Sequence, residues 1–199
     1  MPTMMGERAD SRRKRLRLVE AARRAVAEKG LDVAAADIAA RAEVGVGTLY
    51  RRFGSREALV QDVLVDGLAE VHAVAVEAME DPDPWNGFEA FFLALAESQA
   101  SNRGVSEFTS RHGDGYGEAV ARQSGELQRA IDSLVRRAQE DGSLRADVAW
   151  QDIVLLSDPP ADANGCLGVA VEAGHWRRTT RVTLDGLRTE AARSQPTSG

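Results

Sequence analysis

The chain has 199 residues, enough for one large domain or two small ones, and hydrophobic residues make up 43% of it. Aromatic residues make up only 5% and strand formers are sparse, so the composition predicts an all-α protein. The net charge of −6 is unevenly distributed, because residues 1–60 hold 13 basic and 8 acidic side chains whereas residues 61–199 hold 12 and 23. A basic head on an acidic body suits a protein that meets a polyanion with one end, so the acidic total does not exclude DNA binding.

Several classes of protein are excluded by the residues that are missing. Cys166 is the single cysteine, so the chain can form neither an internal disulfide nor a metal site built on thiolates. No apolar run approaches the roughly 18–20 residues of a membrane span, and the N-terminus lacks the apolar centre of a signal peptide. No nucleophile elbow, phosphate loop or metal-ligand spacing is present. We therefore expect a cytoplasmic protein that is not an enzyme, has no metal or other cofactor, and does not contact membranes.

The first predicted helix follows a polar N-terminus. Residues 1–10 and 194–199 are unpatterned, and we expect both ends to be disordered. The helix starts after Asp10 or Ser11, either of which can cap it, and stops at Gly30. Its apolar positions follow helical spacing: Leu16, Val19, Ala22, Val26 and Ala27.

Two short helices and a long one are predicted next. The short helices cover 35–42 and 47–52, with a four-residue connection between them, and Ser55 caps the long helix that follows. Two short helices joined by a tight turn can place the second of them in the major groove of DNA. This pattern predicts a DNA-binding unit over residues 11–55.

The rest of the chain, residues 56–193, is predicted to form a helical body. Its predicted helices after the long one run from Pro84, from 118 to 140, from 147 to 156 and from 175 to 192. Asp83 should cap the first of these, with Pro84 at its first position, and Asp147 should cap the third. Residues 102–117 hold four glycines and no readable pattern, and we predict no strand anywhere.

The second short helix supplies the candidate DNA contacts. Leu49 and Phe53, four residues apart, should pack it onto the neighbouring helices. The side chains suited to reading base edges or phosphates are Thr48, Tyr50, Arg51 and Arg52.

Two further basic features lie beside that helix. Arg56 starts the long helix, where free backbone N–H groups and the helix dipole also favour a phosphate. A basic cluster on the first helix includes Arg13, and it is either a solvated face or a set of phosphate contacts. Its members are Arg12, Arg13, Lys14, Arg15 and Arg17.

The stretch from Ala36 to Leu59, ADIAARAEVGVGTLYRRFGSREAL, resembles the signature of the TetR family of bacterial regulators. The preceding LVEAARRAVAEKGLDV resembles the opening helix of that family, so the match covers about residues 11–66. The C-terminal WRRTTRVTLDGLR resembles the last helix of some members, with weaker specificity.

The resemblance implies an all-α homodimer with a three-helix DNA-binding head and a larger body that binds a small molecule and dimerises. It implies a transcriptional repressor that releases a palindromic operator when its effector binds, with helices 147–156 and 175–192 forming the dimer interface. DNA contacts of the family carry over to Gly47, Thr48, Tyr50, Arg51 and Arg56.

The chain departs from the family pattern at its turn. Glu43 stands where the family often has glycine, and Gly45 stands where serine or threonine often precedes the recognition helix. The helix at 35–42 also lacks a serine or threonine cap. If the turn residue must be left-handed, Glu43 costs about 1 kcal/mol.

Aromatic and polar residues of the body are candidates for an effector pocket, which needs apolar walls and a few polar groups. The candidates are His72, Phe88, Phe92, Gln99, Phe108, His112 and Trp150. Each aromatic ring could equally belong to an ordinary core. Two other functions remain open: a small-molecule-binding helical protein with weak or lost DNA binding, and an enzyme that uses a helical-bundle pocket.

Overall fold

A computed structural model describes residues 4–110, 116–158, 165–166, 169–170 and 174–189. Within these residues the chain forms nine α-helices and one short β-hairpin, so the all-α prediction is confirmed apart from that hairpin. None of the helices described is both long and apolar enough to cross a membrane.

The chain divides into two compact units. The head unit comprises residues 1–67 and 102–121, and the body unit comprises residues 68–101 and 122–199. The expected boundary after residue 55 therefore differs from the structure, because the start of the long helix and the segment at 102–121 both join the head unit.

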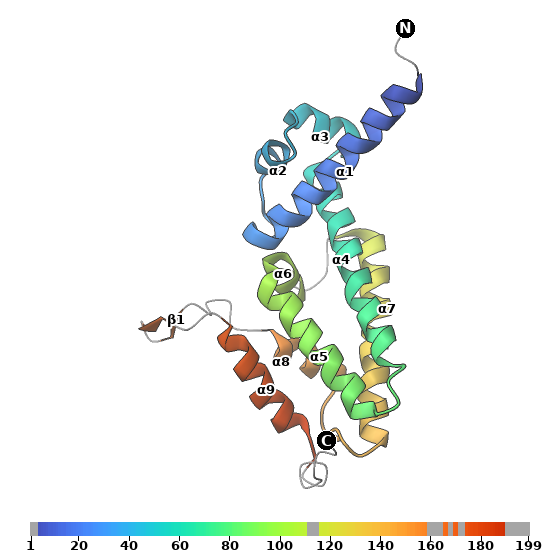
Figure 1. Cartoon of the computed structure of the whole chain (residues 1–199), viewed down its shortest axis with the longest axis vertical. Coiled ribbons are helices and arrows are strands. Elements are labelled where there is room, and N and C mark those ends of the chain that lie inside the picture. The colour runs from blue at the N-terminus through green and yellow to red at the C-terminus, as the bar shows by residue number, and fades with distance from the viewer. Residues whose placement is uncertain (1–3, 111–115, 159–164, 167–168, 171–173, 190–199) are drawn as a thin grey trace. The chain divides into compact units, whose positions relative to one another are not determined.

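The head unit is built on α1, which contacts both α2 and α6 (Figure 1). Its helices are α1 (Met4–Lys29), α2 (Ala35–Arg41), α3 (Val46–Phe53), α6 (Arg103–Ser110), and the first parts of α4 (Arg56–Ala78) and α7 (Gly117–Glu140). Helix α6 lies in the glycine-containing segment 102–117, for which no element was predicted. The short helices α2 and α3 contact each other, and the connection expected between them is present.

The inward face of α1 agrees only in part with the predicted apolar positions. Ala22 and Val26 are buried as their spacing indicated, whereas Leu16 has an exposed fraction of 60% and Leu18, which was not among those positions, is fully buried. Two residues correspond to about 200° around a helix, which puts these leucines on opposite sides. The buried stripe of α1 is Leu18, Ala21, Ala22, Ala25 and Val26. The helix also begins at Met4, so the expected disorder does not hold for residues 4–10.

The helix ends of the head unit follow local chemistry. Gly30, just after α1, has a φ of 84°, which confirms it as the stop signal. The Ser55 hydroxyl accepts a hydrogen bond from the Ala58 N–H at 3.0 Å, which confirms the cap on α4. Ala34 caps α2 without any side-chain hydrogen bond, as the missing serine or threonine predicted.

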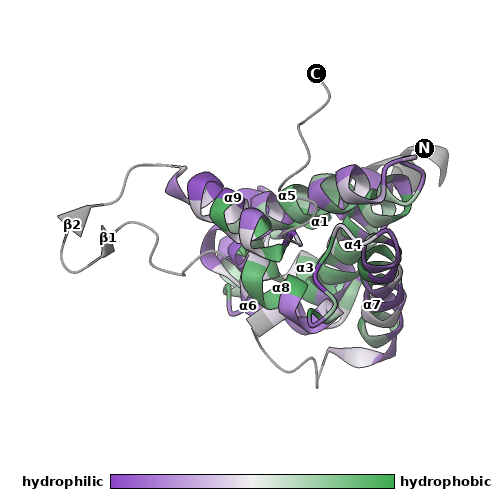
Figure 2. Ribbon diagram, turned by 90° about the horizontal axis from the view of Figure 1, so that it is seen from below, coloured by the Kyte–Doolittle hydropathy of each residue, from purple (hydrophilic) through white to green (hydrophobic). Residues whose placement is uncertain are grey.

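The body unit is built around α5, which contacts α8 and α9. Its elements are the second part of α4, α5 (Pro84–Ser101), most of α7, α8 (Trp150–Ser157), β1 (Gly165–Cys166), β2 (Val169–Ala170) and α9 (His175–Leu187). The two strands are antiparallel, with Gly165 opposite Ala170. In Figure 2, α8 is largely hydrophobic, whereas α7 carries hydrophilic and hydrophobic surface along its length.

Two helix starts in the body unit test the predicted caps. Asp83 accepts hydrogen bonds from the N–H groups of Trp85 (2.8 Å) and Asn86 (3.1 Å), which confirms it as the cap of α5. Asp147 does not cap α8, so that prediction was wrong. The helix begins at Trp150, and Asp147 instead forms a two-bond ion pair with Arg145 at 2.7 and 2.8 Å.

The last helix is shorter than predicted. Helix α9 ends at Leu187 rather than near residue 192, and Arg188 is extended and pairs with Leu144. The loop after α7 therefore provides the hydrogen-bond partners that a further helical turn would have used: Arg145 N–H donates to Leu187 O, and Thr189 N–H donates to Ser143 O.

Candidate nucleic-acid interface

Helix α3 turns one face towards the core of the head unit. Leu49 is fully buried, and Phe53 is half-buried with the Arg15 guanidinium 5.3 Å from its ring centroid. Both residues pack as the sequence predicted. Since α3 is held by one narrow apolar face, its opposite face is available for a partner.

The solvent face of α3 carries three of the predicted DNA contacts. Gly47, Tyr50 and Arg51 are exposed, and their three- and four-residue spacing puts them on one side of the helix. Thr48 is half-buried, with its Oγ1 3.5 Å from Arg51 Nη2. Arg52 is also half-buried and its Nε is shielded from solvent. The face therefore presents a phenol and a guanidinium, which suit phosphates and base edges.

The turn before α3 holds one unusual residue. Glu43 has a φ of 53° and is the one non-glycine residue with positive φ in the described part of the chain. The sequence-based suspicion of a left-handed turn position is therefore confirmed. The Glu43 carboxylate pairs with Arg17 of α1 at 2.5 Å, and Gly45 caps α3 without a side chain. The ion pair joins the turn to α1.

The basic arm of α1, which is the basic cluster from Arg12 to Arg17, includes side chains that form ion pairs within the head unit. Arg12 and Arg13 are exposed, whereas Arg15 pairs with Asp62 at 2.9 Å. Arg13 is therefore accessible to a phosphate, as its predicted role requires.

Arg56 is held inside the head unit. Its Nη1 donates to the carbonyl oxygens of Leu31 (2.6 Å) and Val33 (3.0 Å), and its Nε donates to Glu57 at 3.0 Å. The side chain has an exposed fraction of 22%. Bonding to Glu57 contributes to lowering the pKa of that carboxyl, after the larger effect of its own backbone N–H. The guanidinium that we expected to contact a DNA phosphate is therefore hydrogen-bonded within the head unit.

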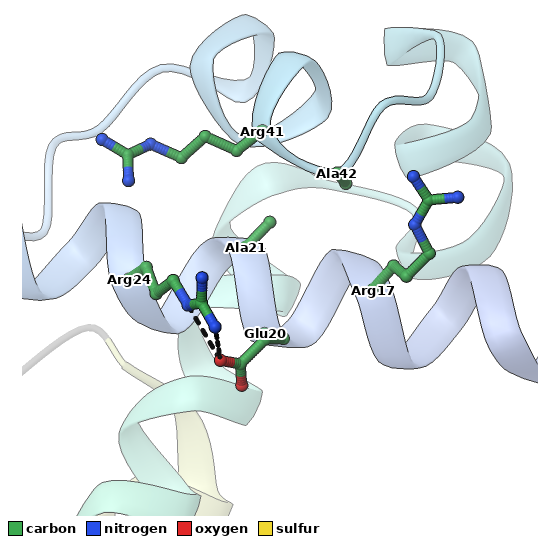
Figure 3. Close-up of a pocket in the computed structure, with 6 residues that line it drawn as sticks. All are labelled: Arg17, Glu20, Ala21, Arg24, Arg41 and Ala42. Carbon is green, nitrogen blue, oxygen red and sulfur yellow. Dashed lines mark hydrogen bonds and ion pairs between the residues drawn. The ribbon is translucent and has the colours of Figure 1, made fainter.

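A surface depression of about 250 Å³ lies where α1 faces α2 (Figure 3). It is lined by Arg17, Glu20, Ala21, Arg24, Arg41 and Ala42. Each arginine has an acidic partner: Arg24 bonds Glu20 at 2.9 Å, Arg41 bonds Glu28, and Arg17 bonds Glu43.

The charges around this depression are balanced. The Arg41 guanidinium lowers the pKa of the Glu28 carboxyl, and the same hydrogen bond raises the pKa of Arg41. The pair therefore favours the charged form of both groups. We interpret the depression as the ion-paired seam between α1 and α2.

The candidate effector residues are distributed over both units. Phe88 and Phe92 are fully buried in the body unit with ring centroids 6.1 Å apart, and the Gln99 amide, 3% exposed, donates to Ser157 Oγ at 2.6 Å. His72 and Trp150, also in the body unit, are half-buried. Two candidates fall elsewhere.

Phe108 belongs to the head unit, on α6, where its ring meets the edge of Tyr116 at a centroid distance of 5.6 Å. His112 lies outside the described residues. The structure therefore groups five of the seven candidates in the body unit.

The short helix pair, the solvent face of α3 and the basic arm define a helix-turn-helix DNA-binding protein. A family profile described as bacterial regulatory proteins, tetR family, matches residues 18–63, and one described as transcriptional regulator SbtR-like, C-terminal domain, matches residues 83–189. The chain belongs to the TetR family and is a DNA-binding transcriptional regulator. Proteins of this family bind DNA and small-molecule ligands and form dimers.

Solved structures share this fold. A TetR transcription regulatory protein from Mycobacterium vanbaalenii is 29% identical, with a TM-score of 0.59 over 92% of this chain and 99% of that one. The TetR regulator SCO0520 from Streptomyces coelicolor is 23% identical, with a TM-score of 0.57 over 88% and 99%. RolR, solved in complex with the ligand resorcinol, is 21% identical, with a TM-score of 0.55 over 96% and 98%. A comparison with curated proteins gave no match.

Proposed function

We propose that the protein is a cytoplasmic repressor that binds a near-palindromic operator as a homodimer and leaves it when a small molecule binds the body unit. The exposed face of α3, with Tyr50 and Arg51 opposite the buried Leu49, is the observation that carries the DNA-binding part. Two copies of this helix, related by a two-fold axis, would enter successive major grooves.

Selection of duplexes from a random pool tests this proposal. Bound duplexes should share a near-palindrome whose half-sites lie about 10 base pairs apart, and affinity should fall steeply as salt rises. Tyr50→Ala and Arg51→Ala should weaken binding, whereas Arg129→Ala, an exposed arginine of α7, should not. Enrichment of no duplex, or equal binding by all three variants, would contradict the proposal. In a reporter strain, deletion of the regulator should raise transcription from the operator, and a fall would contradict repression.

Exposed apolar side chains on α8 and α9 support dimerisation through these helices. Leu155, Leu156 and Val182 have exposed fractions of 67%, 46% and 66%. Burying them against a second copy removes apolar surface from water, which favours association.

Light scattering tests the proposed dimer. The wild type should be a dimer at micromolar concentration, and Leu155→Glu and Val182→Glu should shift it towards monomer. Val76→Glu is the control, because Val76 is similarly exposed (48%) but lies on α4. A monomeric wild type, or equal effects of all three variants, would contradict this interface.

The proposed effector site lies among the body-unit candidates. The buried Gln99 amide lies on a helix whose other buried residues are apolar and include Phe88 and Phe92, and a polar group among apolar walls is typical of small-molecule sites. We therefore expect an effector with an apolar body and at least one hydrogen-bonding group, and the resorcinol bound by RolR, an aromatic ring with two hydroxyl groups, is an example of that chemistry.

A thermal-shift screen of small phenols and aromatic acids tests this site. A ligand that raises the melting temperature binds the folded protein, and an effector should in addition release the operator, because it prefers the folded conformation with low DNA affinity. Gln99→Leu should lower the affinity for that ligand and leave operator binding unchanged. A ligand that binds without changing DNA affinity would contradict its role as an effector.

A further inference from the structure

The loop between α1 and α2, residues 30–34, is held from two sides by charged side chains of the head unit. Glu107 of α6 accepts a hydrogen bond from the Leu31 N–H at 2.9 Å. Arg56 of α4 donates to the carbonyl oxygens of Leu31 and Val33. The Leu31 backbone is thus bonded at its N–H by one helix and at its carbonyl by another. We call these contacts the Leu31 clamp.

The surroundings of the clamp fix its geometry. The Leu31 and Val33 side chains are buried, with exposed fractions of 2% and 3%, so the loop is anchored to the core as well as to the two helices. Arg103 donates to the second carboxylate oxygen of Glu107 at 2.8 Å, which orients that group. Gly30 has a φ of 84°, and a Cβ there would collide with the Glu107 carboxylate.

The clamped loop leads directly into α2, and α2 contacts α3. A shift of residues 31–33 would therefore change where α3 presents Tyr50 and Arg51. We infer that Arg56 and Glu107 are positioning residues for DNA recognition, which orient the helix pair through the Leu31 backbone and do not themselves contact DNA. This inference rests on the proposed DNA-binding face of α3, and it replaces the phosphate contact that the sequence assigned to Arg56.

A matched pair of variants at Glu107 distinguishes a positioning role from an effect of its negative charge on DNA affinity. Glu107→Gln and Glu107→Ala remove the same negative charge, but only glutamine keeps an oxygen that can accept from the Leu31 N–H. Removing a negative charge from a DNA-binding head should strengthen DNA binding if charge alone matters. The clamp predicts that Glu107→Ala weakens operator binding by about tenfold, as for loss of a hydrogen bond to a charged group, and that Glu107→Gln binds within about twofold of wild type.

The salt dependence of operator affinity tests the role of Arg56. Loss of a phosphate contact reduces the slope of log affinity against log salt by about 0.9 per contact, or about 1.8 per dimer. Arg56→Gln should instead weaken binding with an unchanged slope. Arg56→Lys keeps the charge but loses the planar guanidinium that bonds both carbonyls, so it should also weaken binding. A reduced slope for Arg56→Gln together with normal affinity for Arg56→Lys would overturn the inference.

Hydrogen exchange of the Leu31 amide gives a readout that needs no DNA. It should speed up in Glu107→Ala and stay slow in Glu107→Gln, and circular dichroism should show that both variants keep their helices. Failure of the wild type to bind any duplex would refute the proposed function and the positioning role together. Normal wild-type binding with equal affinity and equal Leu31 exchange in both Glu107 variants would refute the positioning role alone.

Discussion

The left-handed turn residue of the helix-turn-helix offers a sharp test of the local energetics. Glu43 has a φ of 53°, which brings the Cβ of an L-residue close to the following carbonyl oxygen. Glycine has no Cβ and avoids this contact. We predict that Glu43→Gly is more stable than Glu43→Ala, although glycine is normally the less stabilising of the two residues.

The magnitude follows from two opposing effects. Relief of the left-handed conformation is worth about 1–2 kcal/mol, and the greater freedom of glycine in the unfolded chain costs about 0.4–1 kcal/mol. Both variants lose the ion pair with Arg17, which is exposed and contributes about 1 kcal/mol or less, so this loss cancels in the comparison. The free energy of unfolding should be about 1 kcal/mol higher for Glu43→Gly than for Glu43→Ala, which corresponds to roughly 2–4 °C in melting temperature for a chain of this size.

Urea titration and differential scanning calorimetry measure this difference. Glu43→Asn is a useful third variant, because asparagine tolerates the left-handed region better than alanine and should fall between the other two. An alanine variant as stable as the glycine variant would refute the argument from backbone strain.

Three further predictions concern packing, capping and pH. Leu49→Ala should reduce the free energy of unfolding by about 2–5 kcal/mol in urea titration, because it opens a cavity beneath α3, whereas Tyr50→Ala should change it by about 0.5 kcal/mol or less. Asp83→Ala should cost about 1 kcal/mol, since the N–H groups of Trp85 and Asn86 lose their partner, and Glu80→Ala, at an exposed position of the same connection, is the control. The ion pair with Arg145 lowers the pKa of Asp147 below its ordinary 3.8, so its contribution is present above pH 3.8 and is lost as pH falls through the lowered pKa. An NMR titration should give that low pKa, and Asp147→Asn should make the acid limb of the stability curve shallower; an ordinary pKa would contradict the ion pair.

The DNA-binding part of the fold could be predicted because its signals are local. Gly30 and Ser55 mark helix ends through their own backbone and hydroxyl chemistry, and both do so in the structure. Leu49 and Phe53 show by their spacing which face of α3 is buried. None of these features depends on a partner far away in the sequence.

The features that sequence reasoning missed depend on distant partners. Arg56 donates to carbonyl groups 23 and 25 residues away, and Glu107 accepts from a backbone N–H 76 residues away. Neither partner is visible in the local pattern around Arg56 or in the glycine-rich segment that contains Glu107. The position of Asp147 before a helix predicts a cap, but its carboxylate accepts two hydrogen bonds from Arg145 instead.

The inward face of α1 could be predicted only in part, for a similar reason. A helix rich in alanine and arginine has several apolar stripes that satisfy the spacing rule, and the stripe that is buried depends on which neighbours pack against it. Contacts with α2 and α6 select the stripe through Leu18 rather than the one through Leu16.

Methylation protection of guanine N7 is the most direct test that α3 lies in the major groove, because that atom is exposed there and not in the minor groove. On a selected operator duplex, the wild type should protect guanines in two half-sites about one helical turn apart. Arg51→Ala, at a concentration that restores full occupancy, should lose protection of specific guanines in each half-site while the rest of the pattern persists. Full occupancy with no major-groove protection, or an identical pattern for the variant, would contradict the assignment of α3 as the recognition helix.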